Sequence, residues 1–182
     1  MGETINISAD LERFYNKLDD ELTVPHLKWN TFEQLFNRNE DRIEILNQTA
    51  PQFFVLVQNI LISDLQLSIC KLTEKHEKGG NKNLSLQVLI KNLSSKHQDL
   101  GKELATIFTE LREQTKGFRD SRNKVIGHLD FDVFNRKKVS ELKSFKIDEI
   151  EKTLELSRDF MNQFSSHFFD SHTYYEEPMS MG

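Results

Sequence analysis

The sequence TAPQFFVLVQNILISDLQLSICKL, residues 49–72, decides the fold that we expect for this chain. Thr49-Ala50-Pro51 is typical of a helix start, because a proline in the first turn loses no intrahelical hydrogen bond. Apolar residues then occupy much of the expected helix surface as far as about Lys75. An apolar surface of this extent is typical of a buried helix. We therefore expect a long central helix over residues 51–75.

Two helices are expected before this segment. Ser8 is a suitable N-cap for a first helix that runs to about Leu22. Pro25 should end this helix, because proline has no N–H to donate. Apolar residues at helical spacing over residues 27–46 predict a second helix, with a break near residues 37–39.

Further helices are expected after the central one. HEKGGNKN, residues 76–83, predicts a loop, since two glycines stand among polar residues. Helical spacing then predicts a short helix over residues 84–93 and a longer one over residues 97–123. Residues 127–136 have no clear period. Asp148 is a suitable N-cap for the last helix.

The sum is an all-α chain, an antiparallel bundle of about five helices. The length of 182 residues fits one domain, and glycine (7) and proline (3) are scarce. Phenylalanine is plentiful at 14, so aromatic packing should form much of the core. We assign residues 1–170 to a single domain and residues 171–182 to a flexible, polar C-terminal tail.

Cysteine content and hydropathy indicate a cytoplasmic protein. Cys70 is the one cysteine and lies in an apolar run, where a thiol is usually a small hydrophobic residue. Without disulfides or metal-spaced cysteines, a reducing compartment fits. Residues 1–10 have no signal-peptide pattern. We expect no apolar run that approaches the ~20 residues of a membrane span.

The charge is unevenly distributed. The whole chain has a net charge of −5, which argues against broad, sequence-independent coating of nucleic acid. Residues 112–138 hold eight basic and four acidic residues, a local net charge of +4. Two interpretations stay open for this segment: a selective anion site, or a solvated helix face.

The segment FRDSRNKVIGHLDFD, residues 118–132, contains the groups best suited to chemistry. Arg122 offers a planar, permanently charged fork for phosphate. His128 can transfer protons near neutral pH, and Asn123 can hold a ligand oxygen or orient a neighbour. His128 has no His or Cys at ligand spacing, so an ordinary metal site is not expected.

Arg122 and His128 would not share one face of a straight helix. Six residues correspond to about 120° of net rotation and about 9 Å along the axis. Either Gly127 bends or ends the helix, or two copies of the motif meet across a dimer axis. As a spacing alone, Arg-x(4–6)-His has roughly 0.8 chance matches in this chain. An ion-pair role for Arg122 and a loop position for His128 are therefore the competing interpretation.

Two stretches resemble a known family. RNKVIGH, residues 122–128, resembles the Arg-x(4–6)-His motif of the HEPN superfamily. LSICKLTEKHEKGGNKNLSL, residues 67–86, is similar to the abortive-infection U-type branch of HEPN-like proteins. The resemblance covers residues 51–130 clearly, and the ends by helical pattern. It implies a small α-bundle that dimerises and, in many members, a metal-independent endoribonuclease with a site composed from both protomers.

The resemblance also implies roles for single residues. Arg122 would bind the scissile phosphate and stabilise its developing charge. His128 would transfer a proton to or from the reacting oxygens, and Asn123 would position the phosphate or His128. Three basic residues would contact flanking phosphates: Arg119, Lys124 and Lys71.

Two carboxylates are expected to support the site. Asp64 lies within the apolar segment, where a carboxylate is costly unless it is paired, and Arg119 or Arg122 is the expected partner. Asp130 stands where HEPN toxins of the nucleotidyltransferase-antitoxin type often carry a tyrosine, which puts that regulation in doubt. If Asp130 touches His128, it raises the pKa of the histidine.

The expected function is thus a defence or toxin–antitoxin endoribonuclease, active as a homodimer on RNA. An antitoxin protein would be a further partner. No cofactor, metal or membrane is expected to take part. Two alternatives stay open: a non-catalytic HEPN-like module that binds nucleotide, RNA or a protein, and a purely structural dimeric bundle.

Overall fold

The computed structural model describes residues 7–37, 39–123 and 146–175. Over these ranges the chain is all-α apart from one small hairpin, which confirms the expected fold class. The elements in chain order are α1 (Ala9–Phe32), the π-helical turn η1 (Glu33–Asn37), α2 (Glu40–Thr49), α3 (Pro51–Leu72), β1 (Glu77–Lys78), β2 (Asn81–Lys82), α4 (Gln87–Asn92), the 3₁₀ turn η2 (Ser95–His97), α5 (Gln98–Gln114), α6 (Lys116–Ser121) and α8 (Ile147–Phe169).

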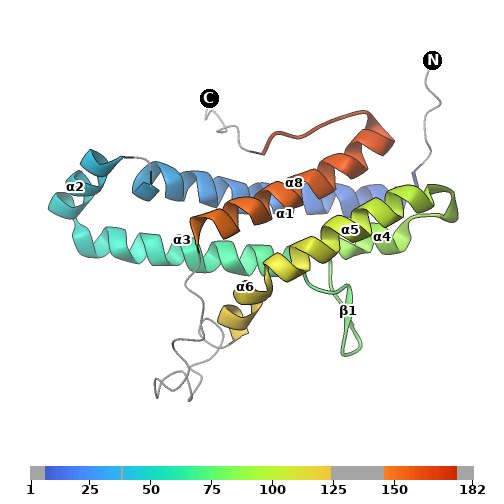
Figure 1. Ribbon diagram of the computed structural model, residues 1–182, viewed down its shortest axis with the longest axis horizontal. Coiled ribbons are helices and arrows are strands. Elements are labelled where there is room, and N and C mark those ends of the chain that lie inside the picture. Colours follow the sequence, from blue (N-terminus) through green and yellow to red (C-terminus); the bar gives the residue numbers. More distant parts are fainter. Residues whose placement is uncertain (1–6, 38, 124–145, 176–182) are drawn as a thin grey trace.

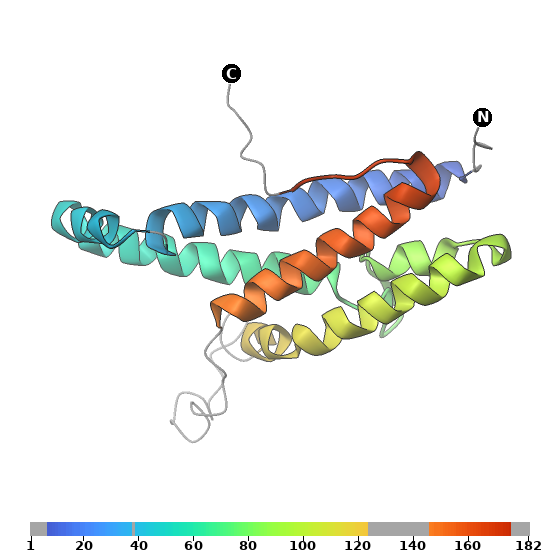
Figure 2. The same cartoon turned by 45° about the horizontal axis from the view of Figure 1, so that its top comes forward.

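Two long helices form the length of the molecule. α1 and α3 lie side by side and antiparallel, and α2 connects them at one end (Figure 1). α8 runs obliquely across α1 and packs along α5 on its other side (Figure 2). α4 fills the space between α1 and α5, and α6 packs against the C-terminal end of α3.

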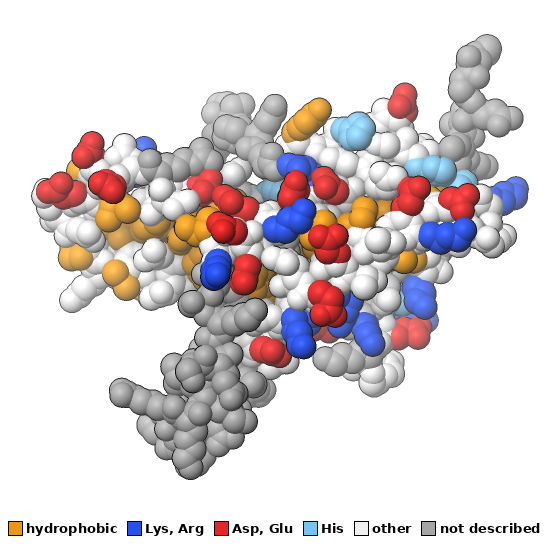
Figure 3. All heavy atoms as spheres, in the orientation of Figure 1, with side chains coloured by type: hydrophobic (Ala, Val, Ile, Leu, Met, Phe, Trp, Pro, Cys, Tyr) orange, Lys and Arg blue, Asp and Glu red, His pale blue; other side chains and the backbone are white. Residues whose placement is uncertain are grey.

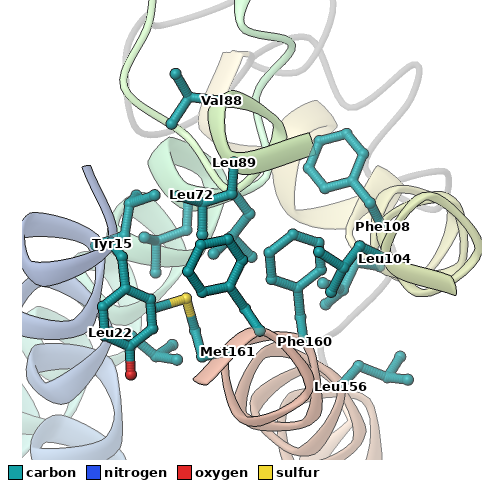
Figure 4. Close-up of a cluster of buried hydrophobic side chains, with 14 of the residues drawn as sticks. Tyr15, Leu22, Leu72, Val88, Leu89, Leu104, Phe108, Leu156, Phe160 and Met161 are labelled. Carbon is teal, nitrogen blue, oxygen red and sulfur yellow. The ribbon is translucent and has the colours of Figure 1, made fainter. Parts of the chain in front are cut away.

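The core consists of two hydrophobic clusters. The larger joins α1, α4, α5 and α8, and Phe160 and Met161 of α8 lie at its centre among side chains such as Tyr15 and Phe108 (Figure 4). The smaller joins α1, α3, α6 and the start of α8, with Trp29, Cys70 and Phe118 among its members. This second cluster lies beneath the arginine-rich end of α6, and so it fixes the position of the candidate site.

The expected end of the first helix at Pro25 is wrong. α1 continues through Pro25 to Phe32. An interior proline removes one intrahelical hydrogen bond, but Leu22, Pro25 and Trp29 are all buried. Burial of this continuous apolar face offsets the local cost. The expected break near residues 37–39 is confirmed: η1 ends at Asn37, and the Asn39 side chain caps α2.

α3 begins at Pro51 as expected, but only its C-terminal half is central. Its buried residues begin at Leu65, whereas Phe53, Leu56 and Ile60 are each more than half exposed. Apolar side chains gather at the α2 end of the molecule (Figure 3). By length and composition alone, Pro51–Leu72 could cross a membrane, and only 22% of its most apolar window is buried. A core helix of a soluble protein or a signal sequence has the same length and composition, so this one helix is weak evidence for a membrane span.

The glycine-containing loop is a short hairpin. β1 and β2 pair antiparallel, with Glu77 opposite Lys82. Gly79 and Gly80 both have positive φ, +61° and +82°, which is the conformation that a two-residue hairpin turn requires. The expected helix over residues 97–123 is divided into η2, α5 and α6, with a break between α5 and α6 at Thr115.

The C-terminal end differs from expectation in two ways. Asp148 lies in the first turn of α8, and the N-cap position is Lys146, so Asp148 is not the cap. The chain also stays packed beyond Ser171: Tyr175 is buried against α1, where its hydroxyl donates to Asp19. The prediction of a flexible tail is therefore wrong for residues 171–175. Residues 176–182 lie outside the described ranges.

Candidate functional site

The break between α5 and α6 brings two arginines over the end of α3. Thr115, at the break, is fully buried, and its hydroxyl lies 3.3 Å from that of Thr73. Phe118 is also fully buried and anchors α6 in the second hydrophobic cluster. Arg119 and Arg122 follow Phe118: Arg122 reaches Glu74 just beyond α3, whereas Arg119 donates back to Thr115 at the break.

Arg122 is held on two sides. Its Nη1 lies 2.5 Å from Oε1 of Glu74, the second residue after α3, and the two side chains are only 20% and 15% exposed. Its Nε and Nη2 both donate to Oδ1 of Asn123 at 3.1 Å. These contacts leave one N–H on Nη1 and one on Nη2 without a partner in the described part of the chain. Asn123, which we expected to position the phosphate or His128, here orients Arg122.

Arg119 and Arg112 bind the ends of neighbouring helices. Arg119 donates from Nη1 to Thr115 Oγ1 at 2.6 Å and from Nη2 to the carbonyl of Arg112, in the last turn of α5. Arg112 donates to the carbonyl of Thr73 at 2.9 Å, just beyond α3. Cations are favoured at these helix ends, where carbonyls lack partners. Burial and the nearby charge of Arg112 lower the pKa of Arg119.

Cys70 lies beneath this cluster in the core. The thiol is completely buried. Burial raises its pKa to about 11, although the charges of Arg122 and Arg119 act in the opposite direction. A thiol with this pKa is protonated at neutral pH and is a poor nucleophile. Cys70 is thus a core residue, as its sequence context predicts.

Lys71 and Asp64, which were also predicted as site residues, both lie on α3. Lys71 is exposed on the last turn of α3, three residues before Glu74. Asp64 is paired, but the partner that we expected was wrong: Lys28 of α1 lies 2.6 Å away. Lys28 also donates to the hydroxyl of Ser68 at 2.9 Å.

Three predicted residues lie outside the described ranges: Lys124, His128 and Asp130. Their roles stay predictions. Among the described residues, no group of three or more His, Cys, Asp or Glu side chains could hold a metal ion.

Glu74 is the residue that sequence reasoning missed. It stands 48 positions before Arg122, and no local periodicity connects the two. The available signal was a carboxylate in the last turn of the expected central helix, in the Leu-Thr-Glu stretch of residues 72–74. Asp64 was the predicted partner instead, because it interrupts an apolar run.

The family comparison covers nearly the whole described chain. The model of the HEPN family AbiU2 matches residues 8–178, from the N-cap of α1 to beyond the packed segment at Tyr175. The chain belongs to the HEPN AbiU2 family. Comparisons with curated proteins and with solved structures give no match. As a HEPN AbiU2 protein, this helical bundle is a module of the abortive-infection type.

Proposed function

We propose that this HEPN AbiU2 protein is a metal-independent endoribonuclease that cleaves RNA at a site formed by two copies of the chain. The observation that carries the proposal is the geometry of Arg122. Its guanidinium is fixed by Glu74 and Asn123, stays 20% exposed, and has one N–H on each of Nη1 and Nη2 without a partner among the described residues. A preorganised donor pair of this kind suits a phosphate oxygen pair.

The chemistry follows from these groups. The RNA 2′-oxygen attacks the adjacent phosphorus while the bond from phosphorus to the 5′-oxygen breaks, which leaves a 2′,3′-cyclic phosphate and a 5′-hydroxyl. Arg122 stabilises the charge that develops on the phosphoryl oxygens. His128 accepts the 2′-hydroxyl proton or protonates the leaving 5′-oxygen. The nucleophile belongs to the substrate, so DNA is not cleaved and no metal-bound water is required.

A second copy of the chain is the partner that we propose for the exposed apolar face of α3. Phe53, Leu56 and Ile60 lie at helical spacing and are 58%, 57% and 56% exposed. A contiguous apolar face of this kind is typical of an interaction surface. Pairing of two copies would bury it and would supply the second protomer that a composite site needs.

Cleavage of single-stranded RNA in excess EDTA tests the catalytic part. We expect Arg122→Ala and His128→Ala to lower the rate by about 100-fold or more. Arg13→Ala, which removes an exposed arginine of α1, should cleave like the wild type. Thermal unfolding of each variant by circular dichroism separates lost chemistry from lost structure. Equal rates in all four proteins, or cleavage that depends on added metal, would overturn the mechanism.

Sedimentation velocity tests the dimer. Phe53→Glu places a charge on the apolar face of α3 and should convert a dimer to a monomer, with helical content unchanged. Tyr174→Glu is the matched control, because Tyr174 is an exposed aromatic residue, 73% exposed, outside α3. A monomeric wild type, or dimers in both variants, would contradict the proposed interface.

One observation favours a second candidate function, a non-catalytic binding module. Arg112, Arg119 and Arg122 all donate hydrogen bonds to the protein itself, as arginines in a purely structural cluster would. This alternative predicts that the wild type binds RNA without cleaving it. It also predicts that His128→Ala binds RNA as tightly as the wild type, which fluorescence anisotropy with labelled RNA would measure.

A further inference from the structure

The β1–β2 hairpin projects from the bundle on the side on which α6 lies (Figure 1). None of its residues belongs to either hydrophobic cluster, and its tip at Gly79 and Gly80 is surrounded by open space. A two-stranded hairpin without a packed face is marginally stable in water. The order of this hairpin therefore comes from its base and not from the core.

Hydrogen bonds hold the base of the hairpin at the end of α3. Asn83 donates from its backbone N–H to the carbonyl of His76 at 2.6 Å, and from its side-chain amide to the carbonyl of Lys75 at 3.0 Å. The ring Nδ1 of His76 donates to the carbonyl of Asn83 at 2.8 Å. The backbone N–H of His76 donates to the side chain of Gln87, the first residue of α4, at 2.8 Å. The hairpin is thus positioned before any ligand binds.

The residues that lead into the hairpin also hold the arginine cluster. The carbonyl of Thr73 accepts a hydrogen bond from Arg112 at 2.9 Å, and the carboxylate of Glu74 holds Arg122. Lys75, whose carbonyl binds the hairpin base, is the next residue along the chain. The hairpin base is therefore one residue from the contact that fixes the guanidinium of Arg122.

These contacts bring two basic segments together. Residues 71–83 and 112–123 contain eight basic and four acidic residues, a net charge of +4, whereas the whole chain has a net charge of −5. Lys75 and Lys82 are exposed, and neither forms an ion pair within the described residues. Of the four carboxylates, that of Glu74 is already paired with Arg122. A local excess of exposed, unpaired cations on an acidic chain favours a bound polyanion.

We propose that the hairpin is a phosphate-binding arm, on which Lys75 and Lys82 contact backbone phosphates of the RNA strand beside the phosphate held by Arg122. The inference rests on the proposed function for its substrate, and it names the part of the chain that holds the RNA outside the reacting linkage. Lysine suits this role, because its ammonium group acts as a point charge and needs no fixed geometry on the phosphate. Contacts to phosphates position the strand and are independent of its base sequence.

Binding of an oligonucleotide that cannot be cleaved tests the arm independently of catalysis. The probe is a fluorescently labelled oligouridylate with 2′-O-methyl groups, which has no free 2′-hydroxyl to attack phosphorus. Fluorescence anisotropy at several salt concentrations gives its Kd. We expect the double variant Lys75→Gln/Lys82→Gln to bind about fivefold more weakly or worse. The slope of log Kd against log salt concentration should also fall by about 1.4, because two phosphate contacts are lost.

The matched control removes two lysines at the other end of α5. Lys96→Gln/Lys102→Gln makes the same change in net charge at exposed positions near the start of that helix, whereas Arg112 lies in its last turn. This control should bind the oligonucleotide like the wild type. Circular dichroism should give the same helical content and melting temperature for all three proteins, since neither pair of lysines is buried.

Cleavage of natural single-stranded RNA separates the arm from the reaction itself. The Lys75→Gln/Lys82→Gln variant should raise KM rather than lower kcat, because the arm binds the ground state and the transition state alike. If no protein cleaves the RNA, the proposed ribonuclease activity fails, and the anisotropy measurement still decides the arm. Three results would overturn the arm: no binding of the oligonucleotide by the wild type, equal affinities of the two double variants, or tighter binding of oligoglutamate, which would indicate an acidic protein partner.

Discussion

The guanidinium of Arg122 and the carboxylate of Glu74 form an ion pair 2.5 Å long between two residues 48 positions apart. Both side chains are more than three-quarters buried. The pair joins the end of α6 to the end of α3, and it fixes the position of the Arg122 guanidinium. It is therefore both a structural contact and part of the candidate site.

Removal of the Glu74 charge should destabilise the protein. Glu74→Gln leaves Arg122 largely buried beside a neutral group, and we expect a loss of about 1–3 kcal/mol in the free energy of unfolding. Urea denaturation followed by circular dichroism would measure it. Glu110→Gln on the surface of α5 should change stability by less than about 0.5 kcal/mol. Equal stability of the two variants would show that the Arg122–Glu74 ion pair does not stabilise the fold.

The Lys28–Asp64 pair should contribute little to stability and nothing to the candidate site. The Asp64 side chain is 53% exposed, so we expect Asp64→Asn to cost at most about 1 kcal/mol. RNA cleavage, where it is observed, should keep the wild-type rate. Asp99→Asn, which breaks a more exposed pair with Lys102, is the control. A loss of cleavage in Asp64→Asn alone would restore the original expectation that Asp64 supports the arginines.

His26 should make the stability depend on pH in acid. Burial and the positive charge of Arg158 lower its pKa in the folded protein to about 4, below the unfolded value of about 6.5. Between these values the unfolded chain binds more protons than the folded chain. Stability is thus fully present above about pH 6.5 and falls as the pH decreases toward 4, by roughly 3 kcal/mol at most. Below pH 4 this contribution no longer changes.

Urea denaturation at several values between pH 4 and 7 would test this dependence. Carboxylates also titrate in acid, so the informative quantity is the difference between the wild type and His26→Phe. We expect the variant to have the shallower dependence. Parallel profiles for the two proteins would contradict a buried, neutral His26.

Cys70 should be inert in the folded protein. It is the one cysteine of the chain, it is completely buried, and its thiol has a pKa of about 11. A disulfide reagent such as DTNB at pH 8 should react about 100-fold more slowly with the native protein than with the urea-unfolded chain. Rapid reaction without denaturant would mean that the second hydrophobic cluster opens readily.

Most of the helical architecture could be predicted because local patterns specify it. Pro51 marks the start of α3, and the break before α2 follows from polar residues at 37–39. Two predictions from local sequence failed, because tertiary packing decided the outcome in each case. Pro25 did not end α1, because its neighbours are buried on one continuous face. Apolar residues of α3 such as Phe53 were expected in the core but are exposed, since no other helix of the described chain covers them.

The sequence by itself determined the all-α class and the core position of Cys70. These follow from periodicity, composition and residue chemistry, which are local properties. Only the tertiary structure decided the partners of the charged groups: Glu74 rather than Asp64 for Arg122, and Lys28 for Asp64. Charge pairing depends on distances between helices far apart in the chain, and those distances are set by how apolar faces pack rather than by the charges themselves.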